Sequence, residues 1–160
     1  MTVATNETTI TVDSKVPMVR ITREFDAPVE KVFRAHTDPD LVRQWLGPRR
    51  LTMAIDHYDC RTGGSYRYLH SGDDGVEHWF HGSFHEVRPN DLIVQTFTYE
   101  GFPEHVALER CQLEDLGNGR TRITATSLVD SFESRDAFVA SGMEYGVKEG
   151  YERLDEILAR

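Results

Sequence analysis

The stretch that decides the fold is the carboxy-terminal run Ser134–Arg160, which reads SRDAFVASGMEYGVKEGYERLDEILAR. Apolar side chains recur in it at spacings of three and four, and this spacing predicts one long amphipathic helix. The members of the stripe are Val139, Met143, Val147, Tyr151, Leu154 and Leu158. Because such a stripe must be buried against another element, the rest of the chain is expected to supply a sheet that covers it.

The segment from Leu51 to Val129 has the composition of that sheet. Runs of β-branched and aromatic residues alternate there with turn signals, which predicts about six strands. The turn signals are Thr62–Gly64, Gly72–Gly75, Pro89–Asp91, Gly101–Pro103 and Gly117–Gly119. The connections are short, which favours antiparallel neighbours. A further strand is predicted from Met18 until the stop at Asp26–Pro28.

Two short helices are predicted between the first strand and this run. Pro28 suits the first turn of a helix, and apolar residues follow it at helical spacing as far as His36. Asp38 and Pro39 provide a side-chain cap and a pre-set φ for the second helix, which ends at Gly47–Pro48.

The order of elements predicts an α+β helix-grip fold, in which a curved antiparallel sheet of about seven strands surrounds a long carboxy-terminal helix. A chain of 160 residues is the size of one domain, placed at residues 18–160. Residues 1–17 are rich in Thr, Asn and Ser and are expected to be a flexible lead-in, with a short strand possible at Thr9–Val12.

Charge and cysteine content exclude several classes of protein. The 27 acidic and 18 basic residues give a net charge of −9, which would repel a nucleic acid or an anionic membrane surface. No segment approaches the roughly 18 apolar residues that span a bilayer. Cys60 and Cys111 lie far apart without CxxC spacing and are expected to be buried free thiols. A cytoplasmic setting is therefore expected.

Motifs for metal, nucleotide or nucleophilic chemistry are absent. In a regular strand His78 faces away from His81 and His85, and those two lie roughly 13 Å apart, so neither spacing chelates a metal. The sequence contains no HExxH, GxSxG, GxGxxG or P-loop motif. No metal, no cofactor and no catalytic residue is predicted.

Glycines and aromatic residues provide the candidate binding site. Gly142, Gly146 and Gly150 each cost about 1 kcal/mol within a helix, so they indicate either close packing of the helix on the sheet or the floor of a cavity. Buried tyrosines need a hydrogen-bond partner or a moist pocket. The inward parity of each strand is left open, and the candidate ligand-binding residues are Trp45, Tyr66, Tyr68, Phe80, Phe97, Tyr99, Met143, Gly146, Val147 and Tyr151.

Several runs in order along the chain carry a family resemblance. They are Ile21–Pro28, Val32–Ala35, Thr37–Pro39, Trp45–Pro48, Arg61–Gly64, Gly82 with Val87–Pro89, and Ser141–Leu154. Over about residues 18–160 the chain resembles the AHSA-like family, named for the activator of the ninety-kilodalton heat-shock chaperone's ATPase. That family belongs to the START/polyketide-cyclase (SRPBCC, Bet v-like) helix-grip superfamily. The resemblance implies a hydrophobic cavity between sheet and helix and a family of small bacterial proteins of unassigned activity, with no fixed catalytic set.

The function expected from these observations is binding of a small hydrophobic or aromatic molecule in that cavity, and whether the protein is also an enzyme is left open. One alternative is a cyclase or hydrolase that uses His57, His81 or a cavity tyrosine as general acid or base. Another is an interaction module that stimulates a chaperone ATPase. The expected partner is a small apolar or aromatic ligand, and a homodimer is an open possibility.

Overall fold

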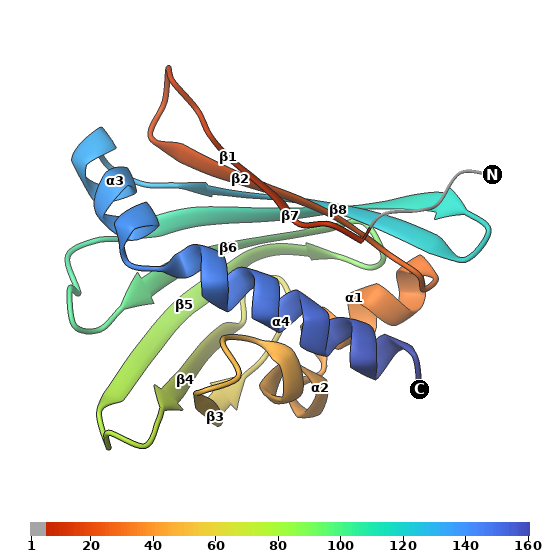
Figure 1. Cartoon of the computed structure of the whole chain (residues 1–160), viewed down its shortest axis with the longest axis horizontal. Helices are drawn as coiled ribbons and strands as arrows, with labels where there is room; N and C mark the ends of the chain where they lie inside the picture. The colour runs from red at the N-terminus through yellow and green to blue at the C-terminus, as the bar shows by residue number, and fades with distance from the viewer. Residues whose placement is uncertain (1–5) are drawn as a thin grey trace.

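The computed structural model describes residues 6–160, and residues 1–5 lie outside the described part. It contains eight strands and four helices (Figure 1). The strands are β1 (Thr9–Val12), β2 (Met18–Phe25), β3 (Thr52–Tyr58), β4 (Ser65–Ser71), β5 (Glu77–Arg88), β6 (Leu92–Tyr99), β7 (Ala107–Gly117) and β8 (Arg120–Leu128). The helices are α1 (Val29–Thr37), α2 (Pro39–Trp45), α3 (Phe132–Ala140) and α4 (Met143–Leu158).

All eight strands form one antiparallel sheet in the order β1-β2-β8-β7-β6-β5-β4-β3. The six strands predicted between Leu51 and Val129 are β3 to β8, and the predicted α+β helix-grip fold is confirmed. The sheet has one strand more than the roughly seven predicted. This additional strand is β1, which pairs with β2 over Thr9–Val12. It lies inside the segment 1–17 that was expected to be flexible, so the sheet extends into that segment.

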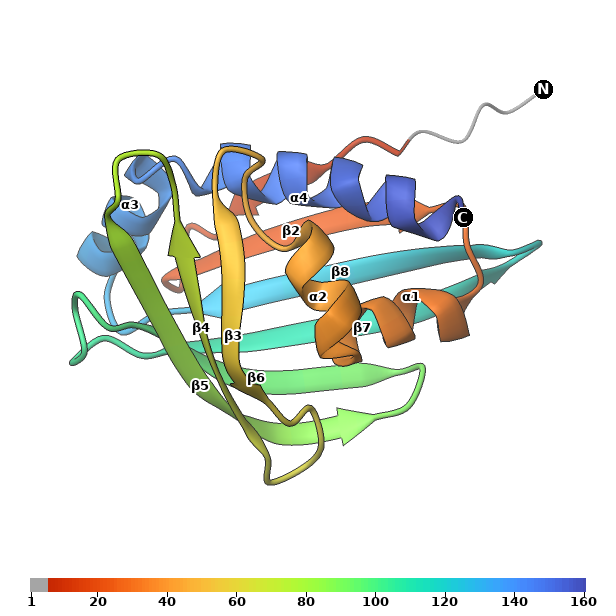
Figure 2. The ribbon, with the colours of Figure 1, turned by 90° about the horizontal axis from the view of Figure 1, so that it is seen from below.

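The two predicted short helices are present with the expected start signals. Pro28 precedes α1 in an extended conformation, and the Asp38 side chain accepts a hydrogen bond from the Asp40 backbone N–H at the start of α2. Asp40, in the first turn, also complements the positive end of the helix dipole. The α1–α2 pair lies beside α4 (Figure 2).

The single carboxy-terminal helix predicted over Ser134–Arg160 is wrong, because the chain forms two helices there. Gly142 has a φ of +88°, in the left-handed region that a helix interior does not contain, and it serves as the N-cap of α4. The Ser131 hydroxyl caps α3 by accepting from the Ser134 backbone N–H. The helical stripe in the sequence runs through this break, which is why periodicity alone did not reveal it.

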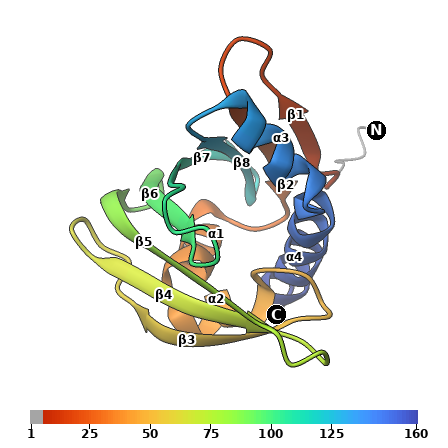
Figure 3. The same ribbon diagram turned by 90° about the vertical axis from the view of Figure 1, so that its left-hand side faces the viewer.

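The sheet curls, and α4 lies across the open side of the curve (Figure 3). Register shifts between Ile55 and His57 and between Phe84 and Glu86 mark β-bulges, which increase the local twist and bend the strands. The inward face of the sheet, together with α1, α2 and α4, encloses two groups of buried apolar residues.

Candidate functional site

The C-terminal half of α4 lies over a closely packed core. Phe25, Ile123 and Leu154 are each 0% exposed there. Trp45 stacks on Tyr151 with ring centroids 6.0 Å apart, and its indole N–H donates to the Ala35 carbonyl at 2.8 Å. Two of the candidate residues, Trp45 and Tyr151, therefore belong to a closely packed core.

The three glycines do not share one role. A Cβ on Gly150 would lie 3.0 Å from the Trp45 backbone oxygen, so this glycine permits close packing of α4 against the end of α2. A Cβ on Gly146 would only meet Pro48 at an ordinary 3.5 Å, and Gly142 is the N-cap. The expected close contact thus exists at one glycine, and it is with the end of α2 rather than with the sheet.

Five of the candidate residues form a row of aromatic rings on the inward face. Tyr68 stacks on Tyr66 at 5.9 Å and on Phe80 at 5.3 Å. Phe80 in turn contacts Phe97 at 5.3 Å and Tyr99 at 5.2 Å. The row crosses β4, β5 and β6 and answers the open question of parity. Phe80 points inward, whereas Trp79 lies outside beneath the Arg67 guanidinium, and Phe97 and Tyr99 share the inward face.

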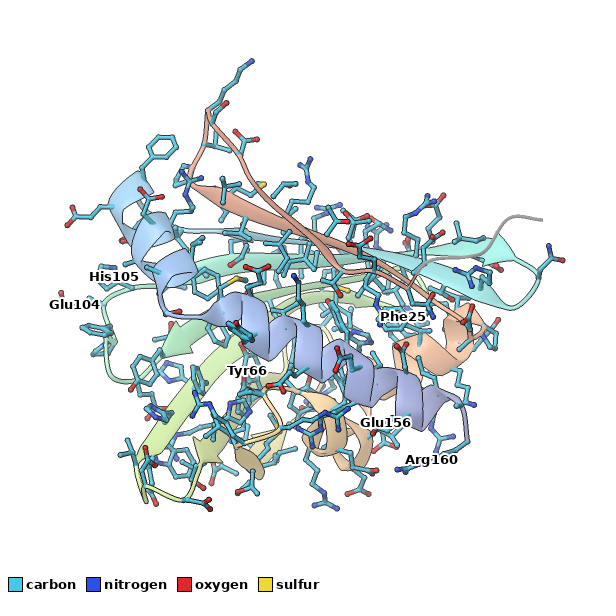
Figure 4. The ribbon with its side chains drawn as sticks, viewed as in Figure 1. Phe25, Tyr66, Glu104, His105, Glu156 and Arg160 are labelled. Carbon is cyan, nitrogen blue, oxygen red and sulfur yellow. The ribbon has the colours of Figure 1, made fainter. Side chains whose placement is uncertain are left out.

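Between the aromatic row and the first half of α4, inward-facing residues remain partly exposed to solvent. Along β8, Ile123 is fully buried but Ala125, two residues further on, is partly exposed. The next inward residue, Ser127, is 6% exposed. The partly exposed set on the inward face and α4 is Ile21, Gln95, Phe97, Glu109, Cys111, Ala125, Met143, Gly146 and Val147. We call this set the central region. Figure 4 labels Tyr66 of β4 and Phe25 of β2, which belong to the two separate groups of buried residues inside the fold.

A polar cluster faces the central region. The Gln95 amide donates to the Tyr66 hydroxyl at 3.2 Å and reaches the Glu109 carboxylate at 3.5 Å. Tyr66 donates to the Thr96 carbonyl at 2.6 Å. Ser127 lies directly opposite Glu109 in the β7–β8 register, and its buried Oγ has no hydrogen-bond partner of good geometry in residues 6–160.

Gly82 makes this arrangement possible. Tyr66 is paired with Gly82 across β4 and β5, and a Cβ at this position would overlap both the Tyr66 hydroxyl and the Thr96 carbonyl. Only glycine leaves enough room for the Tyr66 hydroxyl to reach the Thr96 carbonyl on β6.

Burial raises the pKa of Glu109 from 4.5 to about 7, and the neighbouring Ser127 hydroxyl partly offsets that effect. The cause is loss of water around the carboxylate, because residues 6–160 place no cation beside it. A carboxyl group with this pKa changes charge near neutral pH, so it can act either as an anion or as a hydrogen-bond donor.

The other titratable groups around Glu109 stay neutral. Burial raises the pKa of Tyr66, Tyr68 and Tyr151, and it raises the pKa of the Cys111 thiol to about 12. The negative charge of Glu109 contributes in each case. The two cysteines are free thiols, as predicted. They are partly exposed, whereas the sequence analysis predicted that they are buried.

The histidines considered as acid or base catalysts lie on the outside of the sheet. The His57 ring bonds to Asp56 at 2.9 Å and to Ser65 at 3.1 Å, with about half of its side chain exposed. His81 joins Arg67 and Glu100 in an ion-pair cluster on the same outer surface. Neither contacts the interior, so a mechanism using His57 or His81 inside the fold is wrong. No group of three His, Cys, Asp or Glu residues in the described chain is arranged to hold a metal ion.

Glu109, Gln95 and Ser127 were missed by the sequence analysis. A signal for Glu109 does exist, because Ala107, Cys111 and Leu113 share its parity in β7 and mark the inward face. A charged residue at an inward position is the feature that could have found the site.

Two hollows on the surface lie elsewhere. One of about 380 Å³ is formed around the β1–β2 connection, and one of about 220 Å³ lies between the start of β1 and α4. Their linings are mainly polar, and the candidate residues predicted from the sequence contribute to neither.

Together, a curled antiparallel sheet, two short helices after β2 and a long helix across the open side define a helix-grip domain of the SRPBCC type. Residues 26–159 match the family described as Activator of Hsp90 ATPase homolog 1-like protein, and the chain belongs to this family. The family resemblance seen in the sequence is thereby confirmed. A search of the curated proteins found no match.

Solved structures support the same conclusion. A protein from Rhodobacter sphaeroides is 27% identical with a TM-score of 0.85, over 94% of this chain and 97% of its own. A protein from Arthrobacter aurescens is 27% identical with a TM-score of 0.86, over 94% and 91% of the two chains. Protein Ms6760 from Mycobacterium smegmatis, 22% identical with a TM-score of 0.84 over 95% and 97%, shares the fold. No helix within residues 6–160 has the length and apolar character needed to cross a membrane.

Proposed function

We propose that this domain binds a small apolar or aromatic molecule in its interior, between the sheet and the first half of α4. The observation that carries the proposal is the partial exposure of the central region. An alanine in the middle of a sheet, beneath a helix, is normally packed by its neighbours. Ala125 is instead partly exposed, although the inward residues on both sides of it along β8 are buried.

The lining of the central region suits such a ligand. Phe97, which stacks on Phe80 and is partly exposed, presents an apolar ring, and Met143 and Val147 supply flexible and branched apolar side chains from α4. Gln95 and Glu109 add a small number of polar atoms, which is the usual composition of a small-molecule site.

Filling the central region provides the test. The probe is N-phenyl-1-naphthylamine, a neutral aromatic molecule whose fluorescence rises in apolar surroundings. Ala125→Leu places extra volume inside the proposed site, and Thr124→Leu makes a comparable change on the outer face of the same strand. We expect the natural chain and Thr124→Leu to bind the probe and Ala125→Leu to lose binding while remaining folded. Equal binding by all three chains, or by none, would contradict the proposal.

One observation favours a second function, acid–base catalysis in the same interior. The pKa of Glu109, raised to about 7, suits a general acid or base working near neutral pH. Mass analysis of a bound molecule before and after prolonged incubation distinguishes the two functions, since a carrier returns its ligand unchanged.

A further inference from the structure

The Glu109 side chain faces the interior and is partly exposed to the central region, and no counter-ion lies beside it in residues 6–160. Within residues 6–160, no Lys, Arg or His side chain forms an ion pair with it. The Gln95 amide reaches it at 3.5 Å, which is a long contact, and the Ser127 hydroxyl lies opposite it in the β7–β8 register. Arg23 faces the same interior from β2, but Asp155 of α4 holds both of its terminal nitrogens at 2.6 Å.

We infer that the ligand is a small organic cation, an amine with an apolar or aromatic body, whose ammonium group is received by Glu109. This inference rests on the proposed function and specifies its ligand. A buried carboxylate is costly unless it is paired, and a ligand cation would supply the missing partner.

The groups around Glu109 match the chemistry of an ammonium ion. An ammonium group has several N–H donors and needs several acceptors. Ser127 lies opposite Glu109, is 6% exposed, and has an Oγ with no partner of good geometry in the described chain, so it offers a second acceptor.

The same arrangement disfavours anions. An incoming carboxylate would meet the negative charge of Glu109, and the inward-facing guanidinium of Arg23 is already engaged by Asp155. A neutral alcohol could donate one hydrogen bond to Glu109 but would leave its charge uncompensated.

Binding of such a cation should depend on pH through Glu109. The titratable groups that face it are Tyr66 and Tyr68 from β4, Cys111 from β7 and Tyr151 from α4, and burial keeps all four neutral near pH 7. Arg23 from β2 forms an ion pair with Asp155. Protonation of Glu109 below a pKa of about 7 removes the anion that the amine requires. Affinity should therefore fall as the pH decreases.

The experiment compares three probes of equal chain length by calorimetry at pH 7.5: octylammonium, 1-octanol and octanoate. We expect octylammonium to bind at least about tenfold more tightly than 1-octanol, and octanoate to bind most weakly. Between pH 7.5 and 5.5, the octylammonium affinity should fall by roughly twentyfold while that of 1-octanol stays constant.

Two variants distinguish an effect of the Glu109 carboxylate itself from a general effect of removing a negative charge from β7. Glu109→Gln keeps the size of the side chain and should abolish the preference for octylammonium while retaining 1-octanol. Glu114→Gln removes a carboxylate from the exposed, outward side of the same strand and should leave all three affinities unchanged. If 1-octanol binds and octylammonium binds no better, the cation inference is overturned and the proposed function stands. If none of the probes binds, the proposed function fails as well.

Discussion

The two halves of α4 carry the same helical stripe but have different surroundings. In the second half, Tyr151 and Leu154 are buried against Phe25 and Trp45. In the first half, which we call the open half, Met143 and Val147 continue the stripe but remain partly exposed, with Val147 packed at the border of that core. Apolar periodicity therefore specifies which face of a helix points inward. It does not specify how densely that face is packed along its length.

The largest expected effect is a loss of stability when the core under the second half of α4, which we call the closed half, is disrupted. Leu154→Ala removes a fully buried side chain from a core that has little freedom to collapse, so we expect a loss of about 2–5 kcal/mol in the free energy of unfolding. Val147→Ala, two turns earlier on the same face of α4, should cost less than about 1.5 kcal/mol because this side chain is only partly buried. Urea denaturation of both variants measures the difference, and equal losses would show that the two halves are packed alike.

The next largest effect is the pH dependence of stability that the Glu109 carboxyl group causes. Burial raises its pKa from 4.5 to about 7, so between these values the unfolded chain has released a proton that the folded chain keeps. Stability therefore decreases as the pH rises through this window and is lowest above it. Glu109→Gln cannot ionise, and it should stabilise the protein at pH 8 by on the order of 2 kcal/mol relative to its effect at pH 4.

Denaturation of Glu109→Gln at pH 4, 6 and 8 checks this window, with Glu114→Gln as the control for a carboxylate lost from the outer side of β7. A gain that is the same at all three pH values would show that the Glu109 carboxyl is not desolvated.

The smallest effects come from two glycines of α4. Gly150→Ala would place a Cβ 3.0 Å from the Trp45 backbone oxygen, so crowding should outweigh the gain in helix propensity and destabilise the protein by about 1 kcal/mol. Gly146→Ala meets only Pro48 at 3.5 Å and should stabilise the protein by up to about 1 kcal/mol. Thermal unfolding of the pair should move in opposite directions. A shift of both variants in the same direction would remove this distinction between the two glycines.

Much of the fold could be read from the sequence because local signals and burial agree in it. The turn residues separate β3 to β8, and the Asp38–Pro39 start and the stripe ending at Leu158 mark α2 and α4. The break before α4 could not be read, because Gly142 continues the spacing of Gly146 and Gly150, and only its positive φ distinguishes it.

The candidate site was predicted less completely. Its aromatic members, such as Tyr66 and Phe80, were found because large rings in strands are expected to face inward. Bulges at Ile55/His57 and Phe84/Glu86 shift the strand register, so the parity of β3 and β5 could not be counted from the sequence. Glu109 was overlooked because an acidic residue in a strand is usually solvated.

The most direct measurement of the central claim is a titration of the isotopically labelled protein with 1-octanol, followed residue by residue by NMR. We expect the largest chemical-shift changes in the central region, at Gln95, Glu109, Ala125 and Val147. The signals of Leu154 and Ile157 in the closed half should change little. Shifts confined to the hollow at the β1–β2 connection, or no saturable shifts at all, would contradict it.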